Sequence, residues 1–469
     1  MTKKRQHPPA RSDTERASPK TTPQKRGVLD DHFGPTASSD APGGPVRFPV
    51  VGVGASAGGL DAFAKLVKGL PAAPGMAIVL IQHLDPGHES VMAELLSRHT
   101  SMSVVQATDG MPLQPDQVYI IPPREYLSIQ DGALHLHPRP IRPGPRLPLD
   151  FFLSSLAVAF GEHAISVILT GTGADGSVGL KAVKENGGLV IAQEPKDAAY
   201  DGMPVSAIMT GAVDLILPVD KIPEALLRYT GHDYASGRVR SPSAREQEDK
   251  VLAEVIELLS RTTRRKFGFY RAGTLLRRTH RRMAMRGIDD LDAYKKLLGE
   301  DRAEIDALAR DLLIHVTSFF RDPKAFSLLS EKVIRPLVAD KVSGEAIRIW
   351  VPGCSTGEEA YSIAVLFLEE IARARRDVSF QIFASDPDEA TVAFARNGLY
   401  PTSIESEMSA ERLDRFFTKE THGYRVTSKL RDPVLFTVHD MLSDAPFSRL
   451  DLISCRNVLI YLRPEMQQK

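Results

Sequence analysis

Short apolar runs alternate with amphipathic stretches between about residues 48 and 231. The apolar runs, which predict strands, are VRFPVVGVGAS, MAIVLIQHL, QVYIIPP, AISVILTGTG, GLVIAQ and AVDLILP. The stretches between them repeat apolar residues at the helical period in GGLDAFAKLVKGL, ESVMAELLSRH, PLDFFLSSLAVAFG and GSVGLKAVKENG. Near-continuous apolar strands that alternate with helices predict a mostly parallel sheet covered on both faces.

The pattern then changes twice. Residues 231–248 lose all apolar periodicity and predict a linker, and residues 249–335 are typical of helices throughout. Residues 336–469 return to strand–helix alternation, with predicted strands in AIRIWVPGCS, FQIFASD, LFTVHD and LDLISCRNVLIYL. The fold class is therefore α/β, with two mostly parallel doubly wound sheets, in domains at 47–230 and 336–469, separated by a small basic all-α subdomain.

Composition limits the kind of protein. A chain of 469 residues is too long for one core, and its net charge of +0 argues against nucleic-acid binding by the chain as a whole. Residues 1–46, rich in Pro, Ser, Thr, Lys and Asp, predict a disordered tail without a secretory h-region. No run of 18 apolar residues predicts a membrane span. Cys354 and Cys455 cannot form a zinc site and are interpreted as buried thiols. We expect a soluble cytoplasmic protein with no metal.

The stretch VVGVGASAGG, residues 50–59, has two interpretations. Gly52, Gly54 and Ala57 fit the G-x-G-x-x-G/A turn that approaches a dinucleotide pyrophosphate. Alternatively, Ser56 lies at the apex of a glycine-flanked strand-to-helix turn, where a nucleophile is held. The loop alone does not decide between a phosphate cradle and an attacking serine.

The following strands favour the nucleophile. A dinucleotide fold needs an acid at the end of its second strand, but this strand ends in His83, and Asp85 fits only with a late register. A histidine there can act as general base to Ser56, and Asp175 in TGTGADG can orient the imidazole. Alone, each residue also has a structural interpretation: a helix cap, a core histidine and a turn aspartate. Together they predict a Ser-His-Asp hydrolase.

The motifs VGASAGG, QHLDPGH, ILTGTGADGSVGL and AQEPKDAAYDGMP resemble the catalytic domain of the chemotaxis methylesterase CheB. The resemblance extends over about residues 46–229. It implies hydrolysis of glutamyl methyl esters on chemoreceptors, and deamidation of receptor glutamines, with Ser56 as nucleophile, His83 as base and Asp175 as the orienting acid.

The second α/β region predicts a nucleotide-type cofactor site. The small-residue loop in GCSTGEE follows a strand, and the next strand ends in Asp386, placed to bind ribose hydroxyls. Glu358 and Glu359 would repel a pyrophosphate but suit a cofactor that carries an amine and a sulfonium. An acidic first turn that complements the helix dipole is the structural alternative. The whole constellation favours S-adenosylmethionine over NAD.

The basic helices together with VTSFFRD, GCSTGEEAYS, FASDPD and SCRNVLIYL resemble the chemotaxis methyltransferase CheR, from about residue 251 onward. The chain thus resembles a CheB–CheR fusion. The resemblance implies cofactor contacts at Thr317, Arg321, Glu359, Asp386, Asp440 and Asn457, and a methyl-transfer end formed by Arg321 and Tyr461. His315 and Asp440 stand where the family often has asparagine.

The family's sheet normally has seven strands, and RNVLIYLRPEMQQK would belong to its fourth. We therefore expect an incomplete, C-terminally truncated Rossmann-like methyltransferase domain whose last strand is an unpaired edge. Such an edge would weaken cofactor binding.

Ten Lys or Arg residues and no acid lie between Arg261 and Arg286. Leu275, Leu276, Met283 and Met285 predict a buried face on the same helix, and the block lacks the aromatic platform of a nucleic-acid site. We expect the arginines, chiefly Arg277, Arg278, Arg281 and Arg282, to form an exposed face. It would dock acidic receptor helices or simply be solvated.

The sequence is compatible with three functions. The chain is interpreted as a bifunctional chemotaxis adaptation enzyme that removes and adds methyl groups at receptor glutamates, with S-adenosylmethionine as cofactor. The alternative is a receptor-bound signalling scaffold with an inactive methyltransferase half; an NAD-dependent enzyme is disfavoured by His83 and the acids after Gly357. Expected partners are a methyl-accepting chemoreceptor with acidic methylation helices and a histidine kinase pathway, with no nucleic acid and no membrane insertion.

Overall fold

The computed structural model describes residues 48–82, 92–138, 147–236, 242–313, 315–342, 344–421 and 423–468. The tail predicted at 1–46 lies outside these ranges. Within them, no helix combines the length and apolar character needed to cross a membrane.

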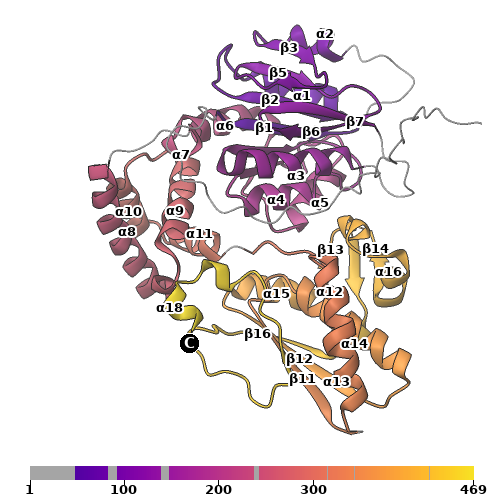
Figure 1. Ribbon diagram of the computed structural model, residues 1–469. Helices are drawn as coiled ribbons and strands as arrows, with labels where there is room; N and C mark the ends of the chain where they lie inside the picture. Colours follow the sequence, from indigo (N-terminus) through magenta and orange to yellow (C-terminus); the bar gives the residue numbers. More distant parts are fainter. Residues whose placement is uncertain are drawn as a thin grey trace, which may run out of the picture. The chain divides into compact units, whose positions relative to one another are not determined.

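A seven-stranded parallel sheet forms the first α/β region (Figure 1). Its members are β1 (Val50–Ala55), β2 (Ala77–Gln82), β3 (Ser103–Gln106), β5 (Gln117–Ile120), β8 (Ala164–Ile168), β9 (Leu189–Gln193) and β10 (Leu215–Leu217). The order is β10-β9-β8-β1-β2-β5-β3, and every pairing is parallel. Six strands coincide with the six predicted runs, which confirms the doubly wound parallel sheet. Only β3, whose two end residues are exposed, gave too weak an apolar signal.

Helices cover both faces of this sheet because successive strand side chains point to opposite sides. Val51 and Val53 of β1 share a core with α1 (Gly59–Lys68) and α6 (Ile222–Gly231). Val50 lies in the opposite core, which the next three helices cover. These helices are α3 (Pro148–Phe160), α4 (Gly179–Glu185) and α5 (Gly202–Met209).

The glycines of β1 are explained by helix packing. A Cβ atom on Gly54 would lie 1.9 Å from Leu149 Cδ2, and one on Gly52 would lie 2.8 Å from Leu153 Cδ2. Leu149 and Leu153 belong to α3, which therefore lies directly against the β1 backbone. The first two glycines of the G-x-G-x-x-A pattern are required by this contact, whether or not a pyrophosphate binds.

Two small antiparallel sheets were not predicted. The first contains β4 (Met111–Pro112), β6 (Glu125–Gln130) and β7 (Ala133–Pro138), and the second contains β13 (Leu399–Tyr400), β14 (Phe417–Glu420) and β15 (Gly423–Val426). Strands of two to six residues, several of them largely exposed, carry little periodic apolar signal.

The predicted all-α region is present. Its helices α8 (Pro242–Thr263), α9 (Ala272–Arg286), α10 (Leu291–Glu300) and α11 (Arg302–Leu313) share one apolar core. Helical structure also extends into the predicted linker, since α7 (Asp233–Ser236) precedes α8. Tyr234 and Ala235 of α7 are buried against the first sheet's core. Two apolar residues are too few to produce a readable period.

The arginines of α9 are less exposed than we expected. Arg278 and Arg281 are 1% and 0% exposed. The Arg281 guanidinium donates to the Gly188 carbonyl at 2.8 Å and pairs with Asp214. Arg282 is paired with Glu304 at 2.6 Å, so Arg277 alone of the four is exposed. The predicted exposed face is therefore wrong for the buried pair, because their partners lie about 65 to 95 residues earlier in the chain.

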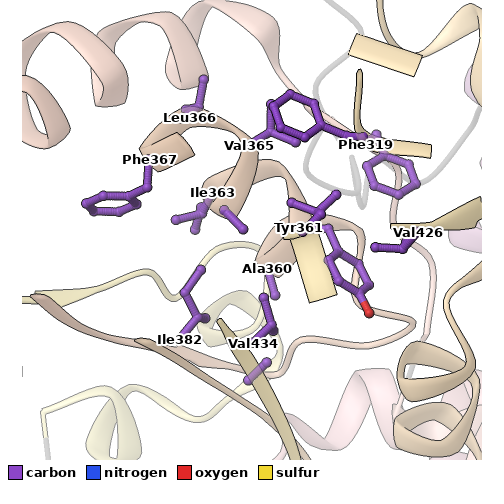
Figure 2. Close-up of a cluster of buried hydrophobic side chains, with 14 of the residues drawn as sticks. Phe319, Ala360, Tyr361, Ile363, Val365, Leu366, Phe367, Ile382, Val426 and Val434 are labelled. Atoms are coloured by element: carbon purple, nitrogen blue, oxygen red, sulfur yellow. The ribbon is translucent and has the colours of Figure 1, made fainter. Parts of the chain in front are cut away.

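The second α/β region has a four-stranded parallel sheet in the order β16-β12-β11-β17. Its strands are β11 (Ala346–Pro352), β12 (Ser379–Asp386), β16 (Val434–Val438) and β17 (Leu452–Ile453). The helix α14 (Glu358–Ala374) covers one face. Figure 2 shows Ala360 and Ile363 of this helix gathered with Ile382 and Val434 of the strands.

The fourth predicted strand is much shorter than expected. β17 has two residues, and the apolar run that follows forms a 3-10 turn at Leu459–Tyr461. Asn457 has φ of 56°, a left-handed conformation that ends extended backbone. The run VLIYL was thus misassigned as strand: Val458 and Tyr461 line a pocket, whereas Leu459 and Ile460 are exposed.

Candidate active sites

Ser56 lies between β1 and α1, at the carboxyl end of the first sheet. Gly58 has φ of 75° and begins the helix, which makes the turn sharp enough to leave Ser56 at its apex. The Ser56 amide donates to the Thr170 carbonyl at 3.0 Å, and the Thr170 hydroxyl donates to the Ala57 carbonyl at 3.1 Å. The turn is therefore fixed to the segment that follows the neighbouring strand β8.

The glycine-rich loop after β8 touches the serine. A Cβ atom on Gly171 would lie 2.9 Å from Ser56 Cβ and 2.3 Å from Met203 Sδ. Met203 belongs to the YDGMP motif, and its amide donates to the Gly171 carbonyl at 2.9 Å. Three separated sequence motifs thus meet around Ser56, as the serine interpretation requires.

Asp175 is 6% exposed in the same loop. Its carboxylate accepts hydrogen bonds from the amides of Leu149 and Asp150, at 3.1 and 3.0 Å. In return, the Asp150 carboxylate accepts from the amides of Val178 and Gly179, at 2.8 and 2.7 Å. Asp175 thus binds the first turn of α3, and Asp150, which lies in that turn, binds the start of α4. These bonds fix the position of the loop that contains Asp175.

Asp150 was not predicted as a site residue from the sequence, although its amide donates to the Asp175 carboxylate. Burial, and then the charge of Asp175, raises the pKa of its carboxyl to about 8. Its Oδ2 atom is buried and has no hydrogen-bond partner among the described residues. An isolated aspartate in an apolar helix start gives no signal of this role in one sequence.

His83 and Asp85 lie outside the described residues. The preceding residue, Gln82, ends β2 and pairs with Ala55, the residue before Ser56. The chain therefore enters the segment that contains His83 beside the serine turn. The base role of His83 stays a prediction.

A second group of predicted residues lines one pocket. Thr317, Arg321, Glu359, Asn457 and Tyr461 come from three separate segments and meet there, together with Gly353, Cys354 and Ser355 of the loop after β11. This pocket lies at the carboxyl end of the second sheet, where ligands bind in open parallel sheets.

One acid lines the pocket, and a second lies outside the lining, against the Ser355 amide of the pocket loop. Glu359 accepts a hydrogen bond from the Ser454 hydroxyl at 2.6 Å, and burial raises the pKa of its carboxyl. Asp386 ends β12 and accepts from the amides of Ser355 and Asp388, both at 3.0 Å. Burial raises the pKa of Asp386 as well, against the opposing charge of His315.

Asp440 and Glu358 lie elsewhere. Asp440 is absent from the pocket lining, and its carboxylate accepts from the Leu442 amide and the Ser443 hydroxyl within its own turn. Glu358 is buried behind the pocket, where it accepts from the Thr356 hydroxyl at 2.6 Å. A cofactor contact by Asp440 stays a prediction, and of the two glutamates only Glu359 reaches the pocket.

The donor set fits S-adenosylmethionine. The pocket offers a carboxylate and a nearby ribose-type aspartate, and the buried Ser355 hydroxyl has no partner among the described residues. These groups suit the cofactor's amine, hydroxyl groups and sulfonium better than they suit a pyrophosphate.

The fold and these sites define a chain with two α/β domains of different classes, one of hydrolase type and one of cofactor-binding methyltransferase type, with helices between them. Residues 51–226 match the CheB methylesterase family. Residues 250–313 match the all-alpha domain of CheR methyltransferase, and residues 315–469 match its SAM-binding domain. Along the chain, a region that matches the CheB methylesterase family is followed by regions that match both domains of CheR methyltransferase.

Several individual proteins are similar to parts of this chain. An uncharacterized 104.1 kDa protein in the hypE 3' region of Rhodobacter capsulatus is 41% identical over 398 residues, covering 81% of this chain and 42% of that protein. The protein-glutamate methylesterase FrzG of Myxococcus xanthus is 36% identical over 39% of this chain and 56% of its own. The Thermotoga maritima CheB methylesterase catalytic domain is 35% identical, with 39% of this chain and 98% of that chain covered, at a TM-score of 0.37. The chain thus spans about half the length of these curated relatives.

Proposed function

We propose that this chain is a bifunctional chemotaxis adaptation enzyme, which hydrolyses glutamyl methyl esters on chemoreceptors and methylates receptor glutamates. The observation that carries the proposal is the assembly of two different sites, each at the carboxyl end of its own parallel sheet. The family matches of both halves support it. The domain limits given above are part of the same proposal.

In the first site, the Ser56 hydroxyl would attack the ester carbonyl after His83 takes its proton. Methanol leaves, and water then hydrolyses the acyl-enzyme. Asp175 would fix the imidazole, and the amide-to-carboxylate bonds at Leu149 and Asp150 would hold Asp175 in place. Deamidation of glutamine would use the same groups and stays a prediction.

In the second site, Glu359 and Asp386 would bind S-adenosylmethionine, which supplies a methyl group activated by its sulfonium. Arg321 and Tyr461 would receive the acceptor glutamate. The Arg321 guanidinium can orient a carboxylate and neutralise its charge. Burial raises the pKa of the Tyr461 hydroxyl, which therefore keeps its proton and can donate a hydrogen bond. The partner is a chemoreceptor with acidic helices; a histidine kinase pathway and a cytoplasmic location remain predictions.

Two measurements on the full chain test this function. Methanol release from a methylated receptor should require Ser56, and calorimetry should detect binding of S-adenosylmethionine. Methanol release without cofactor binding would favour the receptor-bound scaffold with an inactive methyltransferase half. Absence of both would contradict the proposal.

A further inference from the structure

Helix α4 of the methylesterase domain directs three charged side chains at the methyltransferase half. Lys181, Lys184 and Glu185 have i, i+3 and i+4 spacing, so they share one face of the helix. Lys184 Nζ lies 3.2 Å from Asp311 Oδ1 in α11. The other two contact the cofactor-binding domain itself.

Lys181 contacts the segment that forms the pocket wall. Its ammonium donates to the Thr317 carbonyl at 3.1 Å and lies 3.6 Å from Glu407 and 4.0 Å from Glu358. Lys181 is 8% exposed, and the two glutamates raise the pKa of its ammonium against the effect of burial. A charged lysine in this position therefore holds α4 against the methyltransferase domain.

Glu185 reaches the methyl-transfer end. Its carboxylate forms an ion pair with the Arg321 guanidinium, and both side chains are mostly sheltered, at 27% and 28% exposure. Arg321 also donates to the Val316 carbonyl at 3.3 Å. After burial, the charge of Glu185 is the next cause that raises the pKa of Tyr461. The Glu185 carboxylate thus pairs with one residue assigned to the acceptor end, Arg321, and its charge acts on the other, Tyr461.

Two arginines of α9 bind the backbone at the end of α4. Arg278 donates to the Glu185 carbonyl at 3.4 Å, and Arg281 donates to the Gly187 and Gly188 carbonyls at 3.2 and 3.0 Å. Since Arg281 is fully buried, withdrawing this loop would leave its guanidinium without these partners. The anchor keeps Glu185 paired with Arg321, a residue of the pocket lining, when no other carboxylate competes.

We propose that Glu185 is an internal pseudosubstrate: its carboxylate occupies the subsite for the acceptor glutamate and must be displaced before a receptor glutamate can bind. This inference rests on the proposed function of the second site. Glu185 has the same carboxylate group as a receptor glutamate, and it pairs with Arg321, the residue that would orient that glutamate. A receptor therefore competes with the chain's own glutamate, which lowers its apparent affinity.

The test compares the full parent chain with Glu185→Gln, which removes the charge and keeps the volume. Glu185→Asp, with a shorter carboxylate, is a second variant in case glutamine disturbs the helix. The matched control is Glu224→Gln, which removes an exposed glutamate paired with Arg228 in the same domain. The probe is a fluorescent helical peptide with two adjacent glutamates, and its binding is followed by anisotropy without cofactor. Calorimetry with S-adenosylmethionine is run in parallel.

We expect Glu185→Gln to bind the peptide about three- to tenfold more tightly, since a partly sheltered ion pair no longer competes. Glu185→Asp should lie between Glu185→Gln and the parent, and Glu224→Gln should match the parent. Equal or weaker peptide binding by both Glu185 variants would overturn the pseudosubstrate role, while retained S-adenosylmethionine binding would leave the proposed function intact. Failure of the parent to bind S-adenosylmethionine would overturn both.

Discussion

The two halves of the chain contain the same backbone device with different chemistry. In the methylesterase domain, β1 leads into a turn that ends at Gly58, with φ of 75°, before α1. In the methyltransferase domain, β11 leads into a turn that ends at Gly357, with φ of 97°, before α14. The first turn presents Ser56, whereas the helix after the second presents Glu359 to a pocket.

The residue that ends the neighbouring strand also differs between the two domains. Gln82 at the end of β2 donates to the Ser56 carbonyl at 3.4 Å, whereas Asp386 at the end of β12 accepts from the Ser355 amide. A glycine turn after a parallel strand therefore does not define the ligand. The side chain at the apex and the residue that ends the next strand decide between a nucleophile and a cofactor site.

The largest expected effect is a loss of esterase activity that leaves the second turn unaffected. Ser56→Ala removes the proposed nucleophile and should lower methanol release from methylated receptor by several orders of magnitude, as triad deletions do. Binding of S-adenosylmethionine should not change. The control is Ser97→Ala, an exposed serine whose hydroxyl bonds only the Glu94 carbonyl among the described residues. Activity of Ser56→Ala within tenfold of the parent would refute the nucleophile assignment.

The next effect concerns stability. Arg281→Met leaves Asp214 buried beside one fewer cation and should lower the free energy of unfolding by about 3–5 kcal/mol. Arg277→Met, on the exposed side of α9, should change it by less than about 0.5 kcal/mol. Urea unfolding of both variants checks this difference. Similar small changes would show that the buried arginine contributes little to the folded state.

A smaller effect tests the second turn. Asp386→Asn should weaken S-adenosylmethionine binding by about 10- to 100-fold, because it removes an acceptor charge from hydrogen bonds worth about 1.5–3 kcal/mol. Asp440→Asn should have little effect, since the Asp440 carboxylate serves its own turn. Calorimetry measures both. The reverse order would restore Asp440 as a cofactor contact and remove Asp386.

The smallest effect is a pH dependence in the first domain. Burial and the charge of Asp175 raise the pKa of Asp150 from 3.8 to about 8. Between these values the folded state holds a proton that the unfolded chain has lost, so this group's contribution to stability falls as pH rises. Asp150→Asn removes the titration. Its melting temperature relative to the parent should therefore rise by at least about 3 °C between pH 5 and pH 8.5. Parallel melting curves would contradict the raised pKa.

The sequence predicted those features that depend on residues close together in the chain. Six apolar runs identified six strands of the first sheet, and the turns at Ser56 and at 353–357 were recognisable from small residues between a strand and a helix. Thr317, Arg321, Glu359, Asn457 and Tyr461 were assigned through family resemblance, and they do line one pocket.

Contacts between residues far apart in the chain could not be predicted from the sequence. Arg281 was expected on an exposed face because its partners Asp214 and Gly188 are remote in the chain. Asp150 and Glu185 gave no signal at all, since each acquires its role from a residue on another element. The run VLIYL had the composition of a strand, but the left-handed Asn457 before it turns the chain.

We propose that one chain adds methyl groups to receptor glutamates at the turn after β11 and removes them at the turn after β1. The direct test incubates the full chain with unmethylated receptor and S-adenosylmethionine labelled in its methyl group, and measures label on receptor and in methanol. The parent should release labelled methanol continuously, whereas Ser56→Ala should accumulate labelled receptor and release almost none. Equal methanol from both proteins, or no label on receptor with either, would contradict the account.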